Sequence, residues 1–265
     1  MPFLKKNDSS SIELARLGKI LARFPKQRPE LPQAHQDIFA EEYKANREGK
    51  NPAQSIAQRL EQWMHRKVAR GANGANVLEI GAGTLNHLPF EAEFETYDII
   101  EPFRFLFEDS PHLKVVSNVF DDISELPSDV AYDRIISIAV LEHLTHLPTV
   151  IAQSGLSLNK AGVFQAGIPC EGEFLWGAAW RFSTGIEYKI RTGLSYAEVM
   201  RHEHINTAAE IFELTRHFFD NVKISRFPLP LPHLSFYAYI EAQNPREDRC
   251  REFLAQQGAG LEADK

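Results

Sequence analysis

The 265-residue chain has few cysteines, no long apolar run and no excess of basic residues. Its two cysteines, Cys170 and Cys250, form neither a disulfide framework nor a zinc-ligand spacing, which favours a reducing compartment. No apolar run approaches the roughly 20 residues of a membrane span, and the N-terminus has no apolar signal-peptide core. We therefore expect a cytoplasmic protein without a transmembrane segment.

The charge balance opposes nonspecific binding to nucleic acid. The formal net charge is -7 and the sequence pI is about 5.8, whereas nucleic-acid binding needs a basic face that displaces counterions. A local basic patch would still be compatible with this charge. Hydrophobic residues make up 43% of the chain, which is enough for one full core with extensions.

One stretch, V-L-E-I-G-A-G-T-L-N-H at residues 77–87, organises the rest of the chain. Its apolar β-formers predict a buried strand that opens into a G-A-G turn, where missing Cβ atoms let the backbone approach a ligand. A dinucleotide fingerprint would need a third glycine where Asn86 stands. The stretch instead fits the pattern E/D-x-G-x-G, with Glu79 near the end of the strand.

This stretch resembles motif I of the class I S-adenosylmethionine-dependent methyltransferases. The resemblance implies that the glycine turn passes under the amino-acid end and ribose of S-adenosylmethionine, and that Glu79 helps to order the turn. Leu85 replaces the third glycine of the usual E-x-G-x-G-x-G pattern. A helix starting at Thr84 would be shortened or bent by Pro89. By itself the motif also fits an ordinary strand and turn.

Three further apolar runs follow in the order of the same family. Residues 95–101 predict a second strand ending in Glu101, whose carboxylate can accept hydrogen bonds from both ribose hydroxyls. Residues 112–123 predict a third strand ending in acids. By the resemblance, Asp122 rather than Asp121 meets the adenine amino group, although a solvated turn or a helix cap is the alternative for either residue.

The fourth run, Y-D-R-I-I-S-I-A-V-L-E-H-L at residues 132–144, resembles the fourth strand of these methyltransferases. The resemblance implies that residues 138–140 line the methionine side of the cofactor. The cofactor contacts that we expect are Glu79, Gly81, Ala82, Gly83, Glu101, Pro102, Asp122, Ile123, Ala139 and Tyr43.

About seventy residues before the sheet predict helices. A capping box at residues 10–13 predicts the start of an amphipathic helix, which ends at Pro25. This helix is either a packing element or an oligomer contact, and the second alternative would give a homodimer. A second helix is expected at 37–48, and an Asn-Pro cap at 51–52 begins a third with an apolar stripe. In related methyltransferases such helices cover the cofactor, often with a tyrosine. Tyr43 is therefore a lid candidate, with an ordinary packed tyrosine as the alternative.

The C-terminal half predicts a helix at 147–158, a fifth strand at 162–169, and two strands at 221–227 and 234–242 that a short turn makes antiparallel. The expected fold class is α/β: a seven-stranded, mostly parallel, doubly wound sheet with an antiparallel C-terminal hairpin. We divide the chain into an N-terminal helical extension at 1–70, a methyltransferase domain at 71–245 and a polar tail at 246–265, with a short helical patch near Phe253.

An aromatic insert at 170–206 follows the fifth strand. Long inserts in compact domains are usually functional, and this one would stand over the carboxyl ends of the strands, where ligands bind. We expect it to recognise the methyl acceptor, with a structural flap that has its own small core as the alternative.

Two histidines are candidate general bases for a hydroxyl acceptor, since histidine titrates near working pH. His143 follows the fourth strand in L-E-H-L. His204 lies in H-E-H-I-N, before a Thr207–Glu210 capping box, and a structural hydrogen bond is the alternative for either histidine. A metal site at residues 202–204, or at His143 and His146, fits no common ligand spacing.

We therefore expect an S-adenosylmethionine-dependent methyltransferase acting on a small or sugar-like hydroxyl acceptor. The motifs L-E-H-L, E-G-E-F-L-W-G and H-E-H-I-N resemble those of methyltransferases associated with bacterial surface-polysaccharide synthesis. The alternative is a cofactor-binding but inactive partner subunit, motivated by Leu85 and Pro89. A nucleic-acid methyltransferase is disfavoured by the acidity and by the absence of an N-P-P-Y or P-C motif after the fourth strand.

Overall fold

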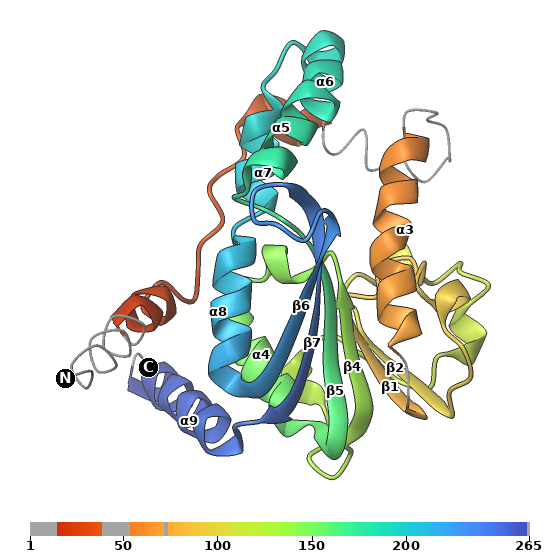
Figure 1. The fold of residues 1–265 in the computed structure, drawn as a ribbon, viewed down its shortest axis with the longest axis vertical. Coiled ribbons are helices and arrows are strands. Elements are labelled where there is room, and N and C mark those ends of the chain that lie inside the picture. The colour runs from red at the N-terminus through yellow and green to blue at the C-terminus, as the bar shows by residue number, and fades with distance from the viewer. Residues whose placement is uncertain (1–14, 39–53, 72–73, 264–265) are drawn as a thin grey trace, which may run out of the picture.

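The computed structural model describes residues 15–38, 54–71 and 74–263 (Figure 1). Tyr43, the expected lid residue, lies outside these ranges, as do the caps expected at 10–13 and 51–52. The helical segment at 15–21 falls where the first helix was expected and ends before Pro25. A second helical segment spans 33–38, so it starts four residues before the helix that we expected at 37–48, most of which lies outside the described ranges.

Seven strands form one sheet in the order β3-β2-β1-β4-β5-β7-β6. Strands β1 to β5 pair in parallel, whereas β7 runs antiparallel to both β5 and β6. This arrangement confirms the expected fold class and its antiparallel hairpin. The bounds are β1 Asn76–Ile80, β2 Thr96–Ile100, β3 Val119–Phe120, β4 Tyr132–Ile138, β5 Leu158–Pro169, β6 Phe219–Pro228 and β7 Ser235–Pro245.

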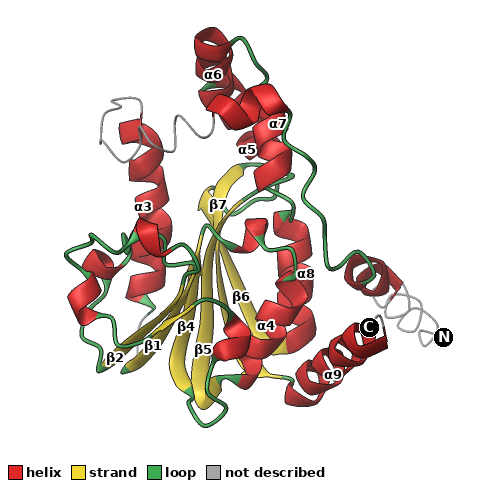
Figure 2. Cartoon of the chain, turned by 180° about the vertical axis from the view of Figure 1, so that it is seen from behind, coloured by secondary structure: helices red, strands yellow, loops and turns green. Residues whose placement is uncertain are grey.

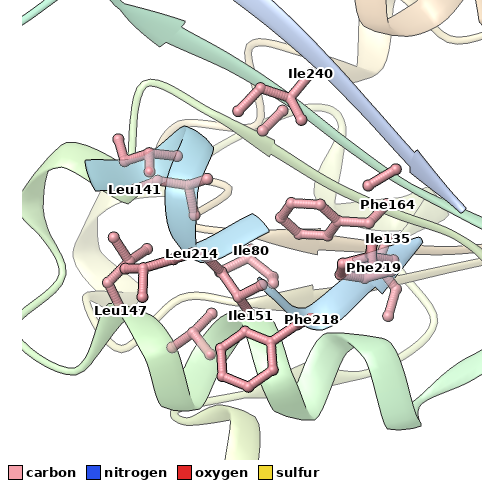
Figure 3. Close-up of a cluster of buried hydrophobic side chains, with 14 of the residues drawn as sticks. Ile80, Ile135, Leu141, Leu147, Ile151, Phe164, Leu214, Phe218, Phe219 and Ile240 are labelled. Carbon is pink, nitrogen blue, oxygen red and sulfur yellow. The ribbon is translucent and has the colours of Figure 1, made fainter. Parts of the chain in front are cut away.

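Both faces of the sheet are buried, which explains the continuous apolar runs of its central strands. Helices α4 (Leu147–Leu156), α8 (Ala208–Phe218) and α9 (Glu247–Ala263) cover one face. Helix α3 (Gln54–Arg70) covers the other, where Met64 and Val68 are buried (Figure 2). Figure 3 shows the larger core, in which side chains of α4 and α8 pack against the sheet.

The third strand is much shorter than expected. We predicted a strand over 112–123, but β3 pairs only Val119 and Phe120 with β2, and Leu113–Val115 forms a 3-10 turn. Strand β3 lies at the edge of the sheet and has a neighbour, β2, on one side only. The residues before Val119 therefore have no second strand that would hold them in an extended conformation. The acids that follow it still reach the carboxyl end of the sheet.

Two other helical expectations change. No α-helix starts at Thr84. Between β1 and β2, the described residues contain a 3-10 turn at Leu88–Phe90 instead, with Pro89 in its first turn. The tail forms the 17-residue α9 rather than a short patch. Cys250 is buried, and the Phe253 ring lies 5.4 Å from that of Phe218, so the tail contributes to the core.

The insert folds as three helices, α5 (Phe174–Phe182), α6 (Thr184–Thr192) and α7 (Tyr196–Glu203), which stand beyond the carboxyl ends of the parallel strands (Figure 1). A small core of Leu31, Tyr188 and Val199 holds α6 and α7 to the segment before α3. The capping box that we predicted at Thr207 and Glu210 is present at the start of α8. Among the described helices, none is long and apolar enough to cross a membrane.

Candidate functional site

A pocket of about 520 Å³ opens at the carboxyl ends of β1, β2 and β4. Its volume lies within the range of small-molecule ligand sites. Eight of the ten expected cofactor contacts line this pocket: Gly81, Ala82, Gly83, Glu101, Pro102, Asp122, Ile123 and Ala139. The structure thus brings together the ends of four sequence motifs that lie far apart in the chain.

The glycine turn has left-handed backbone at three alternate positions. Gly81 has a φ of 72°, and a Cβ there would overlap the side chain of Val140. Gly83 has a φ of 52° and faces open space. Leu85 also has a positive φ, 62°, although its side chain is fully buried. The backbone of the three-glycine turn is therefore kept, and the departure at Leu85 lies in its side chain alone.

Glu101 joins the end of β2 to this turn. Its Oε2 accepts a hydrogen bond from Gly83 N at 2.9 Å, and its Oε1 accepts one from Phe103 N at 3.0 Å. A carboxylate has about four acceptor positions, so each oxygen keeps capacity for a further donor. A ligand with two adjacent hydroxyls fits this arrangement, and the buried Glu101 lines the pocket where it would lie.

Glu79 does not line the pocket. Its side chain is buried, and the Tyr97 hydroxyl on β2 donates to its Oε2 at 2.7 Å. Burial is the main reason that the pKa of Glu79 is raised to about 8, and the hydrogen bond from Tyr97 opposes part of this shift. This contact joins β1 to β2 within the sheet.

Asp122 caps the 3-10 turn Ile123–Glu125, as one of the two expected roles required. It also lines the pocket, so this cap is compatible with a contact to a bound ligand. Its Oδ1 accepts from Ser124 N at 2.9 Å and from Ser124 Oγ at 2.6 Å. Burial works against ionisation, but these hydrogen bonds hold the pKa of Asp122 below its usual value. Asp121 lines the same pocket.

His143 lines the pocket on the β4 side, in the 3-10 turn Leu141–His143. Its Nδ1 lies 2.8 Å from the carbonyl oxygen of Glu203, which can only accept, so Nδ1 carries the proton of this bond. Its Nε2 lies 3.6 Å from Glu142 Oε1. The ring meets that of His204 edge to face, with centroids 4.9 Å apart.

His204 is held by two residues of the insert. Its Nδ1 lies 3.1 Å from Glu171 Oε2, which also accepts from Trp176 Nε1 at 2.6 Å. The Trp176 ring stacks on the His204 ring at 6.3 Å between centroids. A carboxylate at Nδ1 leaves Nε2 as the basic nitrogen of a neutral ring.

Sequence reasoning missed two residues of this cluster. Arg28 donates from Nη2 to the carbonyl oxygen of His143 at 2.9 Å and lines the pocket, but no local pattern connects residues so far apart in the chain. Glu142 is buried, its Oε2 has no partner among the described residues, and burial raises its pKa. Glu142 could have been predicted as part of the cluster, because it directly precedes His143 in the motif L-E-H-L.

The histidines and acids of H-E-H-I-N diverge. His202 Nδ1 lies 2.7 Å from the carbonyl oxygen of Pro29, while His204 turns towards Glu171. Within the described ranges, no group of three or more His, Cys, Asp or Glu side chains converges as a metal site.

Comparisons with known proteins point to one family. The family model of the methyltransferase domain matches residues 53–207, more than half of the chain. A search of the curated proteins finds no match.

The similar solved structures share the fold at low identity. A methyltransferase from Thermotoga maritima, described as a possible histamine N-methyltransferase, is 16% identical with a TM-score of 0.53, covering 78% of this chain and 96% of that one. The plantazolicin methyltransferase BpumL, solved with a monoazolic desmethylPZN analogue and SAH, is 12% identical with a TM-score of 0.53, covering 88% of this chain and 99% of that one. An O-methyltransferase family protein from Burkholderia thailandensis is 12% identical with a TM-score of 0.52, covering 90% and 70%.

The sheet order, the glycine turn with its acid at the end of β2, and the family match agree with one another. The chain therefore belongs to the methyltransferase-domain family and is a class I S-adenosylmethionine-dependent methyltransferase.

Proposed function

We propose that this enzyme methylates a hydroxyl group of a small or sugar-like acceptor, with His204 as general base. The observation that carries the proposal is a cluster of three separate motifs beside the pocket. L-E-H-L supplies His143, E-G-E-F-L-W-G supplies Glu171 and Trp176, and H-E-H-I-N supplies His204.

The residues of the pocket fit S-adenosylmethionine. Glu101 keeps acceptor capacity for the ribose hydroxyls, and Asp122, which lines the pocket, would accept from the adenine amino group in preference to Asp121. Gly83 has no Cβ and faces open space, so S-adenosylmethionine could approach the backbone of the turn closely at this residue. Ala139 and its neighbours after β4 would border the methionine part.

The proposed chemistry is a single methyl transfer with proton removal. S-adenosylmethionine supplies a methyl group already activated on a sulfonium, so in-line positioning of the acceptor contributes much of the rate. His204 Nε2 would take the proton of the acceptor hydroxyl as its oxygen bonds to the methyl carbon, while the bond from that carbon to sulfur breaks and S-adenosylhomocysteine is left. Glu171 at Nδ1 holds the ring in the required tautomer and stabilises the imidazolium that results.

We place the acceptor in bacterial surface-polysaccharide synthesis, on the strength of the three motifs and their resemblance. Aromatic side chains beside His204 suit the faces of a sugar ring: Trp176 packs at 5.6 Å from Tyr237. Two buried free cysteines fit work in the cytoplasm.

The test is a screen for methyl uptake from labelled S-adenosylmethionine. Nucleotide sugars, glycans, small phenols and primary amines are offered, and the methylated atom is located by mass spectrometry and NMR. We expect transfer to a sugar hydroxyl that depends on His204. Transfer only to amines would refute the acceptor class, and cofactor binding without turnover on any acceptor class would favour the inactive partner subunit.

A further inference from the structure

An exposed apolar surface lies at one pole of the molecule. Among the described residues, seven of the ten exposed large hydrophobic side chains belong to α5, α6 or the loop between β6 and β7. We call this set the apolar pole, and its members are Phe174, Phe182, Ile186, Ile190, Leu229, Leu231 and Leu234. Figure 1 shows α5, α6 and the loop at the same end of the chain fold. Gatherings of exposed apolar side chains mark interaction sites on folded proteins.

Backbone contacts join the two parts of the apolar pole. Leu175 N, next to Phe174, donates to the carbonyl oxygen of His233 at 3.0 Å, and His233 N donates to Glu173 Oε2 at 3.0 Å. The loop that carries Leu231 and Leu234 is thus fixed against the start of α5. Helix α6 follows α5 directly in the chain, so the loop, α5 and α6 are connected in sequence and structure.

Helix α6 is apolar on two sides. Tyr188 is buried against Leu31 and Val199, which accounts for the packed side of this helix. Ile186 and Ile190, spaced by one turn, face outward, and Ile190 is 81% exposed. Phe182 at the end of α5 is 77% exposed. Packing within the described fold does not require these three side chains to be apolar.

The charges around this surface are basic, unlike the chain as a whole. Residues 174–192 contain Arg181, Lys189 and Arg191 against the single acid Glu187, which pairs with Arg191 at 3.0 Å, so Arg181 and Lys189 carry the excess charge in a chain of net charge -7. Long basic side chains beside aromatic and branched apolar residues suit the interface of an anionic bilayer, where the stems remain in the apolar region and the cations reach the headgroups.

We propose that the apolar pole docks this enzyme on an anionic lipid membrane. A second copy of the chain fits less well, because it would bring the same net positive charge to a surface that is already basic, whereas an anionic bilayer complements that charge. The insert also projects beyond the strands, which leaves its outer side open to a flat surface (Figures 1 and 2). This inference goes beyond methyl transfer and does not depend on the acceptor proposed above.

One consequence concerns the place of the reaction. Trp176, which packs on His204, belongs to the same helix as Phe174 and Phe182. A membrane held at the apolar pole therefore stands beside the proposed acceptor end of the site. An acceptor attached to a lipid could be methylated while it stays in the bilayer.

The experiment is co-sedimentation of the full chain with lipid vesicles. One preparation is phosphatidylcholine alone, and the other contains about 30% phosphatidylglycerol to supply a negative surface. We expect binding to the anionic vesicles that weakens with added salt, and binding to the neutral vesicles weaker by about tenfold or more. The double variant Phe182→Ser, Ile190→Ser should lose about tenfold or more of the anionic binding.

Val130→Ser is the matched control, because Val130 is an exposed apolar residue outside the apolar pole. It should bind vesicles as the parent does. Both variants should have the circular dichroism spectrum of the parent and the same calorimetric heat of S-adenosylmethionine binding. Unchanged binding by the double variant, or no binding by the parent, overturns the proposal. A mass that doubles with concentration and reverts in the double variant, without vesicle binding, would assign this surface to self-association instead.

Discussion

His204 Nδ1 and Glu171 Oε2 lie 3.1 Å apart, although 33 residues separate them in the chain. The hydrogen bonds from His204 and Trp176 outweigh burial and hold the pKa of Glu171 below its usual value, so the carboxylate is charged at neutral pH. This contact distinguishes His204 from His143, whose Nδ1 meets a backbone carbonyl. A charged partner favours the imidazolium that a base becomes.

We first predict that His204→Ala lowers kcat by about 100-fold or more, since loss of a general base typically costs this much. Glu171→Gln should also lower kcat with little change in cofactor affinity, and Glu171→Asp should recover part of it. The measurement is kcat and KM across pH with melting temperatures for each variant. His112→Ala, outside the pocket, is the control. Near-normal turnover in His204→Ala would show that positioning alone drives the reaction.

A second prediction concerns Glu101. Glu101→Gln should weaken binding of S-adenosylmethionine and S-adenosylhomocysteine by about tenfold or more, since bonds to a charged acceptor contribute about 1.5–3 kcal/mol. Isothermal titration calorimetry measures the affinities for both forms of the cofactor. NAD, tested in the same way, should give no heat of binding. Glu95→Gln is the matched control, because this exposed glutamate precedes the same strand at its far end. Equal affinities for the two variants would refute the ribose assignment.

The third prediction is that Leu85→Gly destabilises the protein, although glycine is the usual residue at this position in the family. Relief of the left-handed backbone would gain about 1–2 kcal/mol. Removal of a fully buried leucine costs about 2–5 kcal/mol, so we expect a net loss of about 2 kcal/mol in unfolding free energy. Urea titration measures it. Cofactor affinity should not change, because Leu85 does not line the pocket; a more stable glycine variant would contradict the argument.

A fourth prediction follows from the buried Glu79. Its pKa is about 8 in the folded chain against an ordinary value of 4.5, so the folded state holds a proton that the unfolded state releases. The contribution of Glu79 to stability is therefore complete below about pH 4.5 and falls as the pH rises to about 8. Glu79→Gln keeps an acceptor for Tyr97 and cannot ionise. The melting temperature of this variant should rise relative to the parent between pH 5 and pH 8, and parallel curves would disprove the shift.

The sequence predicted the elements whose residues are buried on both sides. Strands β1, β2 and β4 appear as apolar runs, and the acids and glycines at their ends mark the pocket. The prediction failed at β3, where only two residues pair at the sheet edge and no periodic pattern separates a strand from a 3-10 turn.

The proposed catalytic cluster could be predicted only in part from the sequence. Both histidines were candidates because of their type and place, but nothing local pairs His204 with Glu171 or brings Arg28 to the His143 turn. Such contacts arise from the packing of the insert on the strand ends, which depends on the whole chain. Leu85 shows the reverse case, since the sequence suggested a broken turn and the backbone keeps its form.

The place of β7 between β5 and β6 sets the order in which the protein can fold during synthesis. Strand β5 ends at Pro169, and its antiparallel partner β7 starts only at Ser235. While the intervening residues are made, the edge of β5 has no partner within the described sheet, and the insert is already present with its apolar side chains. Exposed strand edges and apolar surface invite aggregation in nascent chains. The last strand to leave the ribosome therefore closes the sheet, and a chain stalled before Ser235 should need chaperone protection.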